Sequence, residues 1–259
     1  MSVAPSALRL TVDRPEDAML RLEDATVVFD GFKALDIDRF SVRHNEVRVV
    51  IGPNGAGKTT LCDVISGKTR LKSGKVSFNG ADISHLKDFE IARLGVGRKF
   101  QTPAVFGSLT VQENLELAAP ISKSVLPALY RKTSPEDRDR IREVIAAVGL
   151  DAVIDIQAQY LSHGQRQALE IGTLLVSSPK LLLIDEPAAG LSDDETEAMA
   201  GLIRKLAAGH TVIVIEHDMD FVRQLEADIT VLNEGKILAE GAMSAVQADP
   251  RVIEAYLGR

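Results

Sequence analysis

The sequence is poor in several residue types that would indicate particular classes of protein. Its 259 residues include one cysteine, no tryptophan and only 4% aromatic residues. The single cysteine, Cys62, cannot form an internal disulfide and leaves no cysteine cluster for a zinc site. Because Cys62 lies in a predicted helix, we interpret it as a small buried side chain rather than a reactive thiol.

Long apolar runs are also absent. No stretch approaches the ~18 apolar residues of a membrane span, and no apolar core follows a basic N-terminal start. We therefore expect a cytoplasmic protein that acts at a membrane only through partner chains. The formal net charge of −7 argues against a general binder of nucleic acids or anionic membranes. Apolar residues make up 45% of the chain, enough for one large α/β domain or two small ones.

What the sequence does contain is a glycine-rich loop, Gly52 to Thr60, between the apolar run Val47 to Ile51 and the helix-like stretch Leu61 to Ser66. Glycines at this spacing let backbone N–H groups curl around an anion, and the helix that follows directs its own N–H groups at the same point. Lys58 adds a cation at the outer phosphates, and the Thr59 hydroxyl is suited to ligate Mg²⁺. The predicted nucleotide-binding residues are Gly52, Asn54, Gly55, Gly57, Lys58, Thr59 and Thr60.

A small β-rich region flanks this loop. Asp30-Gly31 supplies a turn between strand-like segments, and a further short strand runs from Lys75 to Phe78. Phe29 is a candidate face for stacking adenine, with Phe32 as the alternative. An ordinary position in the strand core is the competing interpretation of Phe29. Residues 1–18 are predicted to be a flexible arm, followed by a single domain over residues 19–259.

The rest of the chain alternates helical and strand patterns. Residues 111–178 are predicted to form a mostly helical insert after an irregular stretch from Gly95 to Thr110. The apolar runs Lys180 to Asp185 and Thr211 to Glu216 are typical of parallel strands covered on both faces. A hairpin follows, and Ser244 to Leu257 is predicted to be helical.

An acidic pair and a helix start form a second group of candidate residues. Asp185 and Glu186 follow a buried strand, at the edge where open α/β sheets place their ligand chemistry. Asp185 is suited to hold Mg²⁺ or its water, and Glu186 to orient and deprotonate an attacking water. Upstream, Ser162 is placed to cap a helix and so to offer a second anion site, although a plain helix cap explains the same residues.

In this order the motifs resemble those of an ABC-type ATPase, the nucleotide-binding subunit of an ABC transporter. The matching segments are the phosphate loop Gly52 to Thr60, the Q-loop glutamine Gln101, the signature Leu161 to Gln165, the Walker B end Asp185-Glu186, the D-loop Gly190 to Asp193 and the switch histidine His217. One departure is His163, which stands where the family has the first signature glycine. The resemblance implies an α/β P-loop NTPase with a RecA-like, mostly parallel sheet core, an antiparallel β subdomain and a helical subdomain.

The resemblance also implies a mechanism shared between two subunits. Two ATPase subunits pair head to tail, so that ATP and Mg²⁺ on one phosphate loop are covered by the signature residues Ser162, Gly164 and Gln165 of the other. The remaining implied roles are Mg²⁺ ligation and water sensing by Gln101, contact with the γ-phosphate by His217, and communication across the dimer by Asp193.

Membrane partners follow from the same resemblance. The stretch Thr102 to Leu109 and the helical insert are implied to receive a membrane subunit, with Val105 and Phe106 as apolar contacts, unless these two side chains pack inside the insert. The segments that resemble ATP-binding subunits of urea importers, within the branched-chain amino-acid transporter group, are Gly97 to Pro103, Leu161 to Gln165 and Val252 to Arg259. We expect urea or a short amide as the solute, with a branched-chain amino acid as the alternative.

The expected partners are a second ATPase subunit, identical or paralogous, transmembrane permease subunits at the cytoplasmic face of the plasma membrane and, indirectly, a solute-binding protein. A soluble ABC ATPase acting on nucleic acid or ribosomes is a competing function, but the single phosphate loop, the lone cysteine and the acidic balance argue against it. A nonhydrolysing regulator is a second competitor. It conflicts with the presence of both Glu186 and His217.

Overall fold

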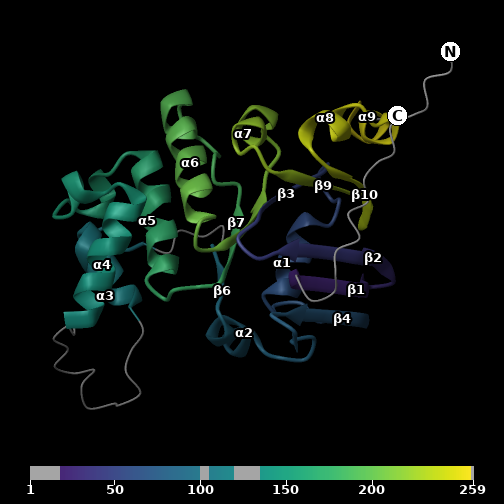
Figure 1. The fold of residues 1–259 in the computed structure, drawn as a ribbon, viewed down its shortest axis with the longest axis horizontal. Coiled ribbons are helices and arrows are strands. Elements are labelled where there is room, and N and C mark those ends of the chain that lie inside the picture. Colours follow the sequence, from purple (N-terminus) through teal and green to yellow (C-terminus); the bar gives the residue numbers. More distant parts are fainter. Residues whose placement is uncertain (1–17, 100–104, 120–134, 258–259) are drawn as a thin grey trace.

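The computed structural model describes residues 18–99, 105–119 and 135–257. The expected arm over residues 1–18 lies outside these ranges except for Ala18, which is the first residue of a strand. Elements in the described ranges form two sheets and a group of helices (Figure 1). Among the described residues, no helix is both long and apolar enough to cross a membrane.

The first sheet is antiparallel and has the strand order β2-β1-β4-β5. Its strands are β1 (Ala18–Phe29), β2 (Phe32–Arg43), β4 (Ser73–Phe78) and β5 (Ala81–Asp82). Asp30 and Gly31 form the two-residue turn between β1 and β2, both with positive φ, as the twist of a tight hairpin requires. The predicted turn and the β-rich region are confirmed.

The second sheet carries the predicted nucleotide-binding motifs and has the order β10-β9-β3-β8-β7-β6. Its strands are β3 (Val47–Ile51), β6 (Val96–Arg98), β7 (Leu181–Asp185), β8 (Thr211–Ile215), β9 (Asp228–Asn233) and β10 (Lys236–Gly241). All neighbours pair in parallel except β9 and β10, which form the predicted hairpin. The apolar runs of β7 and β8 are buried along their whole length, as expected for strands covered on both faces.

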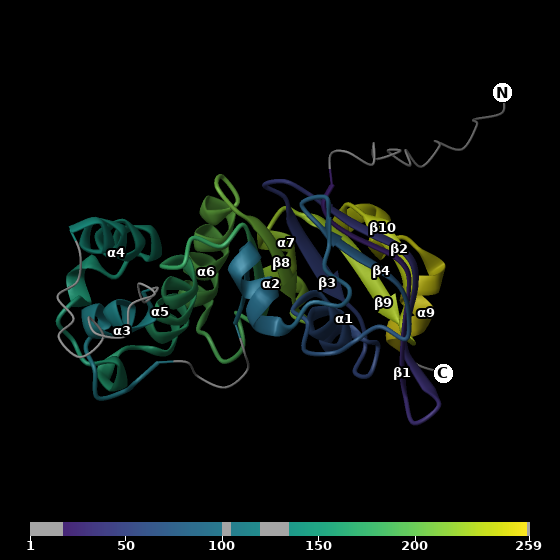
Figure 2. The same ribbon diagram turned by 90° about the horizontal axis from the view of Figure 1, so that it is seen from below.

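The helices cover the two faces of this sheet unequally. Their bounds are α1 (Lys58–Ile65), α2 (Asp88–Leu94), α3 (Val111–Ala118), α4 (Pro135–Val148), α5 (His163–Leu175), α6 (Asp193–Leu206), α7 (Met219–Gln224), α8 (Met243–Gln247) and α9 (Pro250–Leu257), with short 3-10 turns at Asp151–Val153 and Ala158–Tyr160. Helix α1 packs in the layer between the two sheets, whereas α3, α4 and α5 gather at the opposite end of the molecule (Figures 1 and 2).

Alternate residues of the strands divide the core into two clusters. Val50 and Ile213 face α1 and the antiparallel sheet, and their neighbours Val49 and Val214 face the helices on the other side. This division follows from the two-residue period of a strand. The loop after β3 begins at the edge of the sheet and leads into the start of α1.

Three short elements escaped the sequence prediction. The stretch predicted to be irregular from Gly95 contains β6, which pairs with β7, and α2 and α7 were not foreseen. Gly97 in the middle of β6 weakens the strand signal, but a Cβ there would lie only 3.2 Å from Pro179. The stretch predicted to be helical at the C-terminal end is two helices, because Pro250 begins a new one.

Candidate functional site

The phosphate loop follows β3 and leads into α1, as the sequence predicts. Gly55 and Gly57 have φ of 80° and 104°, a region that L-residues with side chains rarely adopt. A Cβ on Gly57 would also lie 2.8 Å from the Ala34 carbonyl oxygen, so this position has room only for glycine. Gly57 is the N-cap of α1 and provides no side-chain cap, which leaves the first N–H groups of the helix for a ligand.

The loop and the end of β7 enclose a cavity of about 290 Å³. Its lining residues are Ala34, Asn54, Gly55, Ala56, Gly57, Lys58, Thr59, Thr60, Asp185, Glu186 and Ile215. Most of the predicted phosphate-loop residues thus meet the predicted acidic pair in one place. Gly52 lies at the base of the loop, where a Cβ would lie 2.2 Å from the Leu232 carbonyl oxygen.

The Lys58 ammonium is folded back onto the loop. Its Nζ donates to the carbonyl oxygens of Gly52 at 2.7 Å and Pro53 at 3.0 Å. Burial lowers the pKa of Lys58, and the attraction of Glu186 and Asp185 only partly opposes that effect. An incoming phosphate would supply the anion that this half-buried cation lacks.

The two acidic residues differ in environment although they are adjacent. Asp185 is buried at the end of β7, and burial, followed by repulsion from Glu186, raises its pKa. Glu186 has φ of +47°, and its N–H donates to the Ile215 carbonyl of β8 at 2.9 Å. Such a backbone conformation costs energy in a non-glycine residue and is common at functional sites. The Glu186 side chain lines the phosphate-loop cavity.

His217 lies beside Glu186 at the end of the neighbouring strand. Its Nδ1 is 3.4 Å from Glu186 Oε1 and 3.8 Å from Glu216 Oε2. Glu216 is buried and accepts hydrogen bonds from the N–H groups of Ala188 at 3.0 Å and His217 at 3.0 Å. Burial raises the pKa of Glu216 despite these bonds. Glu216 therefore fixes the loop after Glu186 to the loop that carries His217.

The sequence interpretation did not assign a role to Glu216. Its position, a carboxylate directly before a histidine at the end of an apolar strand, was the available signal. The pattern does not reveal that the Glu216 carboxylate accepts from the N–H of Ala188, which lies in the loop after β7, 28 positions away in the chain.

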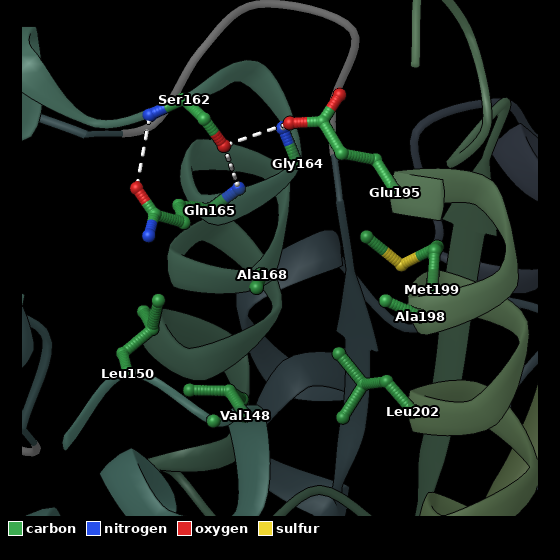
Figure 3. A pocket seen from close by; sticks show the side chains of 11 residues that line it. Val148, Leu150, Ser162, Gly164, Gln165, Ala168, Glu195, Ala198, Met199 and Leu202 are labelled. Carbon is green, nitrogen blue, oxygen red and sulfur yellow. Dashed lines mark hydrogen bonds between the residues drawn. The ribbon is translucent and has the colours of Figure 1, made fainter. Parts of the chain in front are cut away.

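The signature segment forms the N-terminus of α5, and Ser162 is its N-cap, as predicted (Figure 3). The Ser162 Oγ accepts from the Gln165 N–H at 3.2 Å, and the Gln165 side chain accepts from the Ser162 N–H at 3.0 Å. His163, the departure from the family pattern, points its Nε2 at the Ala189 carbonyl, 3.0 Å away. The unusual histidine thus contacts the loop that follows Glu186.

A carboxylate that was not singled out in the sequence also contacts the signature segment. Glu195, in the first turn of α6, accepts from Ser162 Oγ at 2.7 Å and from the Gly164 N–H at 2.9 Å. These bonds, that of Ser162 first, hold the pKa of Glu195 at about 2. The spacing Ser192-to-Glu195 predicts a capping box within α6, which is present, but it does not reveal the contact with α5.

Two of the predicted groups do not line the phosphate-loop cavity. Ser162, Gly164 and Gln165 line a separate pocket, and Asp193 lines a hollow of about 510 Å³ that also contains His217. The chain therefore keeps its signature residues apart from its own phosphate loop.

The remaining predicted residues lie on the surface or outside the described ranges. Phe29 and Phe32 flank the β1–β2 turn and are 49% and 66% exposed, so Phe29 is not an ordinary core residue. Neither lines the cavity. Phe106 is 57% exposed, whereas Val105 packs against the core. Of the two apolar side chains, only Phe106 is therefore exposed for the expected contact with a membrane subunit. Gln101 lies outside the described residues.

The donor set of the cavity suits a magnesium ion bound together with a nucleotide. Thr59 offers a hydroxyl and Asp185 a carboxylate, both oxygen ligands of the kind that Mg²⁺ prefers. Across residues 18–99, 105–119 and 135–257, no group of three or more His, Cys, Asp or Glu side chains is placed to hold a metal alone. The ion would therefore complete its shell with water and phosphate oxygens.

Comparison with known proteins identifies the family to which this chain belongs. The family model described as "ABC transporter" matches residues 35–189, and one described as "Branched-chain amino acid ATP-binding cassette transporter" matches residues 236–259. The "High-affinity branched-chain amino acid transport ATP-binding protein BraF" of Pseudomonas aeruginosa is 35% identical over 249 residues, covering 93% of this chain and 98% of its own.

Solved structures agree. A crystal structure of an ATP-binding cassette of an ABC transporter in its ADP conformation superposes with a TM-score of 0.83 at 34% identity, covering 93% of this chain and 99% of that one. A dimeric cassette in a post-hydrolysis state, bound to ADP and Pi, superposes with a TM-score of 0.69 at 26% identity, covering 87% and 99%. The chain therefore belongs to the ABC transporter family, as an ATP-binding cassette with the P-loop NTPase fold and ATPase activity.

Proposed function

We propose that this ATPase powers a membrane importer of the branched-chain amino-acid transporter group. The observation that carries the proposal is the separation of two anion-binding elements in one chain. The phosphate-loop cavity contains Lys58, Asp185 and Glu186, while the signature residues Ser162 and Gly164 line a different pocket. A chain needs only one such element for its own nucleotide, so we infer that the second serves the nucleotide of a partner.

The hydrolytic roles follow from the geometry of the cavity. The Lys58 ammonium moves from the carbonyl oxygens of Gly52 and Pro53 to the outer phosphates of ATP. Asp185 and Thr59 would hold Mg²⁺, which would supply positive charge to neutralise the phosphates. Glu186 orients and deprotonates the attacking water, because its carboxylate lies in the same cavity and is not buried like that of Asp185.

His217 supports this chemistry from the neighbouring strand. Its Nδ1 already lies 3.4 Å from Glu186 Oε1, so one imidazole can contact both the glutamate and a γ-phosphate in the cavity. Gln101 is proposed to sense Mg²⁺ and the attacking water from the Q-loop. Phe29 or Phe32 is proposed to stack on adenine at the exposed β1–β2 turn.

Two such subunits pair head to tail in this proposal. Ser162, Gly164 and Gln165 of one subunit cover the triphosphate held by the other, and Asp193 communicates across the interface. The dimeric relative bound to ADP and Pi supports pairing of two such subunits, and the partner proposed here is a second copy or a paralogous ATPase. The exposed Phe106 supports contact with a transmembrane permease at the cytoplasmic face of the membrane.

The transported solute has two candidates. The relatives that match nearly the full chain carry names of branched-chain amino-acid transporters, which favours that solute over the urea or short amide expected from the sequence. Urea remains a second candidate because Gly97 to Pro103 and the signature variant with His163 resemble urea-importer subunits. An identity of 35% leaves room for a change of solute within one transporter group.

The proposal is tested with the purified full chain and two variants. Glu186→Gln should keep ATP bound, lower turnover by about a hundredfold or more, and accumulate an ATP-dependent dimer seen by light scattering. Adding Ser162→Arg to that variant should abolish the dimer, because an arginine at the N-cap fills the phosphate position. Undiminished hydrolysis by the first variant would remove Glu186 as the base, and a persistent dimer with the second would contradict the shared site.

A further inference from the structure

The Glu195 carboxylate joins the N-terminal ends of α5 and α6 (Figure 3). One oxygen, Oε1, accepts from Ser162 Oγ at 2.7 Å and from the Gly164 N–H at 2.9 Å. The other, Oε2, accepts from the Ser192 N–H at 3.2 Å. An anion therefore already lies at the start of the signature helix, and it comes from the same chain.

The donors that Glu195 uses are limited in number. A serine hydroxyl has one proton to donate and a backbone amide has one. Both are given to the Glu195 carboxylate here. In the proposed dimer the same two donors, on Ser162 and Gly164, bind the γ-phosphate of the partner's ATP. They cannot serve both acceptors fully at the same time.

Charge and space add to this conflict. The low pKa of Glu195, about 2, keeps the side chain anionic at every physiological pH, so it repels an approaching phosphate. The carboxylate also lies close to the helix start, because a Cβ on Gly164 would be 3.0 Å from the Glu195 carboxylate carbon, Cδ. A γ-phosphate that reached Gly164 would have to take the place of this carboxylate.

We propose that Glu195 is an internal substitute for the γ-phosphate, which occupies the Ser162 and Gly164 donors until the partner's ATP displaces it. The proposal rests on the two-subunit site described under the proposed function. Glu195 then acts as an autoinhibitory contact: each signature segment is satisfied within its own chain while the subunits are apart. Closing the dimer requires the exchange of this carboxylate for a phosphate.

The displaced Glu195 side chain can turn toward the start of its own helix, but not into the pocket beneath the signature segment. That pocket has a volume of about 180 Å³ and cannot accept a carboxylate, because its walls are mostly apolar. Those walls include Val148, Leu150, Ala168, Ala198, Met199 and Leu202. In the other direction, Oε2 already lies 3.2 Å from the Ser192 N–H and 3.4 Å from Ser192 Oγ. Glu195 can therefore turn onto its own helix cap without unfolding α6.

A different role would give the opposite result. If Glu195 merely held Ser162 in the orientation that a phosphate needs, its removal would weaken dimer closure. If it competes with the phosphate, its removal strengthens closure. The ATP concentration needed for dimerisation therefore rises on removal of Glu195 if it orients Ser162, and falls if it competes with the phosphate.

The experiment compares full-length chains that carry Glu186→Gln, so that ATP is not consumed. Light scattering during an ATP titration with Mg²⁺ gives the concentration at half-dimerisation. Adding Glu195→Gln should lower that concentration about three- to tenfold, because two charge-assisted hydrogen bonds no longer have to be exchanged. Glutamine preserves the capping box of α6, so the fold is kept.

Asp194→Asn is the matched control, since it removes one negative charge from an exposed position in the same helical turn. Its half-dimerisation concentration should stay within about twofold of the Glu186→Gln background, the size expected for an exposed charge. An equal decrease in both variants would assign the effect to net charge and overturn the proposal. So would an unchanged or higher ATP requirement with Glu195→Gln.

The background variant distinguishes the failure of this inference from failure of the proposed function. If Glu186→Gln alone forms no ATP-dependent dimer, the shared site and the role of Glu195 are both wrong. If it dimerises and Glu195→Gln does not ease that dimerisation, only the role of Glu195 is wrong. Equal thermal midpoints of the two variants would confirm that both are folded.

Discussion

The helix that follows the phosphate loop carries a thiol that its surroundings keep protonated. Cys62 is 1% exposed within α1. Burial raises the pKa of the thiol to about 12, and the nearby Arg98 opposes that shift only in part. The structure confirms the sequence interpretation of Cys62 as a small buried side chain.

Cys62 should therefore resist alkylation while the chain is folded. The thiolate is the reactive form, so at pH 8 iodoacetamide should modify the native chain about a hundredfold more slowly than the chain unfolded in guanidinium. Mass spectrometry would follow the added group, and Cys62→Ser provides the blank because the sequence has no other cysteine. Rapid labelling of the folded chain would contradict the packing of α1 between the sheets.

The end of β6 connects the phosphate-loop helix to the signature helix. Arg98, its last residue, contacts Asp63 of α1 at 2.5 Å. The next residue, Lys99, is buried, lies 3.4 Å from Glu170 of α5 and also contacts Gln167. Consecutive residues thus join the two helices just before the chain reaches the Q-loop.

The buried pair of Lys99 and Glu170 should be costly to break from one side. Lys99→Met leaves a buried carboxylate without its cation and should lower the free energy of unfolding by about 3 to 5 kcal/mol. Lys99→Met with Glu170→Met should recover much of that loss, because no uncompensated charge remains. Guanidinium unfolding curves measure both. A double variant no more stable than the single one would show that packing, rather than charge, governs this contact.

Some helices and strands could be predicted from the sequence, and others could not. Long apolar runs predicted β3, β7 and β8, and the cap Ser162 predicted the start of α5, because burial on both faces or a regular helical period leaves a strong pattern. The strand β6 has three residues and α7 has six, too few to show any period. The contacts of Glu195 and Glu216 could not be predicted for another reason. Their partners lie far away along the chain, and only the fold brings them together.

Across the whole cassette, the proposed hydrolytic residues are divided between two pockets. The phosphate-loop cavity holds the groups proposed to bind the nucleotide and to activate water, and the signature segment proposed to cover a partner's nucleotide lines another pocket. The two regions are joined inside the chain through His163 and Ala189, and through Glu195. These contacts join the signature segment to the loop after Glu186 and to the start of α6.

The solute must be tested in the assembled transporter, because the residues of the ATP site bind a nucleotide and not the cargo. We expect vesicles containing this chain with its cognate permeases and solute-binding protein to take up labelled leucine when ATP is enclosed, and not labelled urea. Glu186→Gln should lower uptake about a hundredfold, in parallel with the decrease expected for hydrolysis. Glu226→Gln, a change at an exposed residue outside the ATP site, should leave uptake unaltered. ATP-dependent uptake of urea without leucine would reject the branched-chain assignment and support the candidate based on Gly97 to Pro103, while the ATPase role would stand.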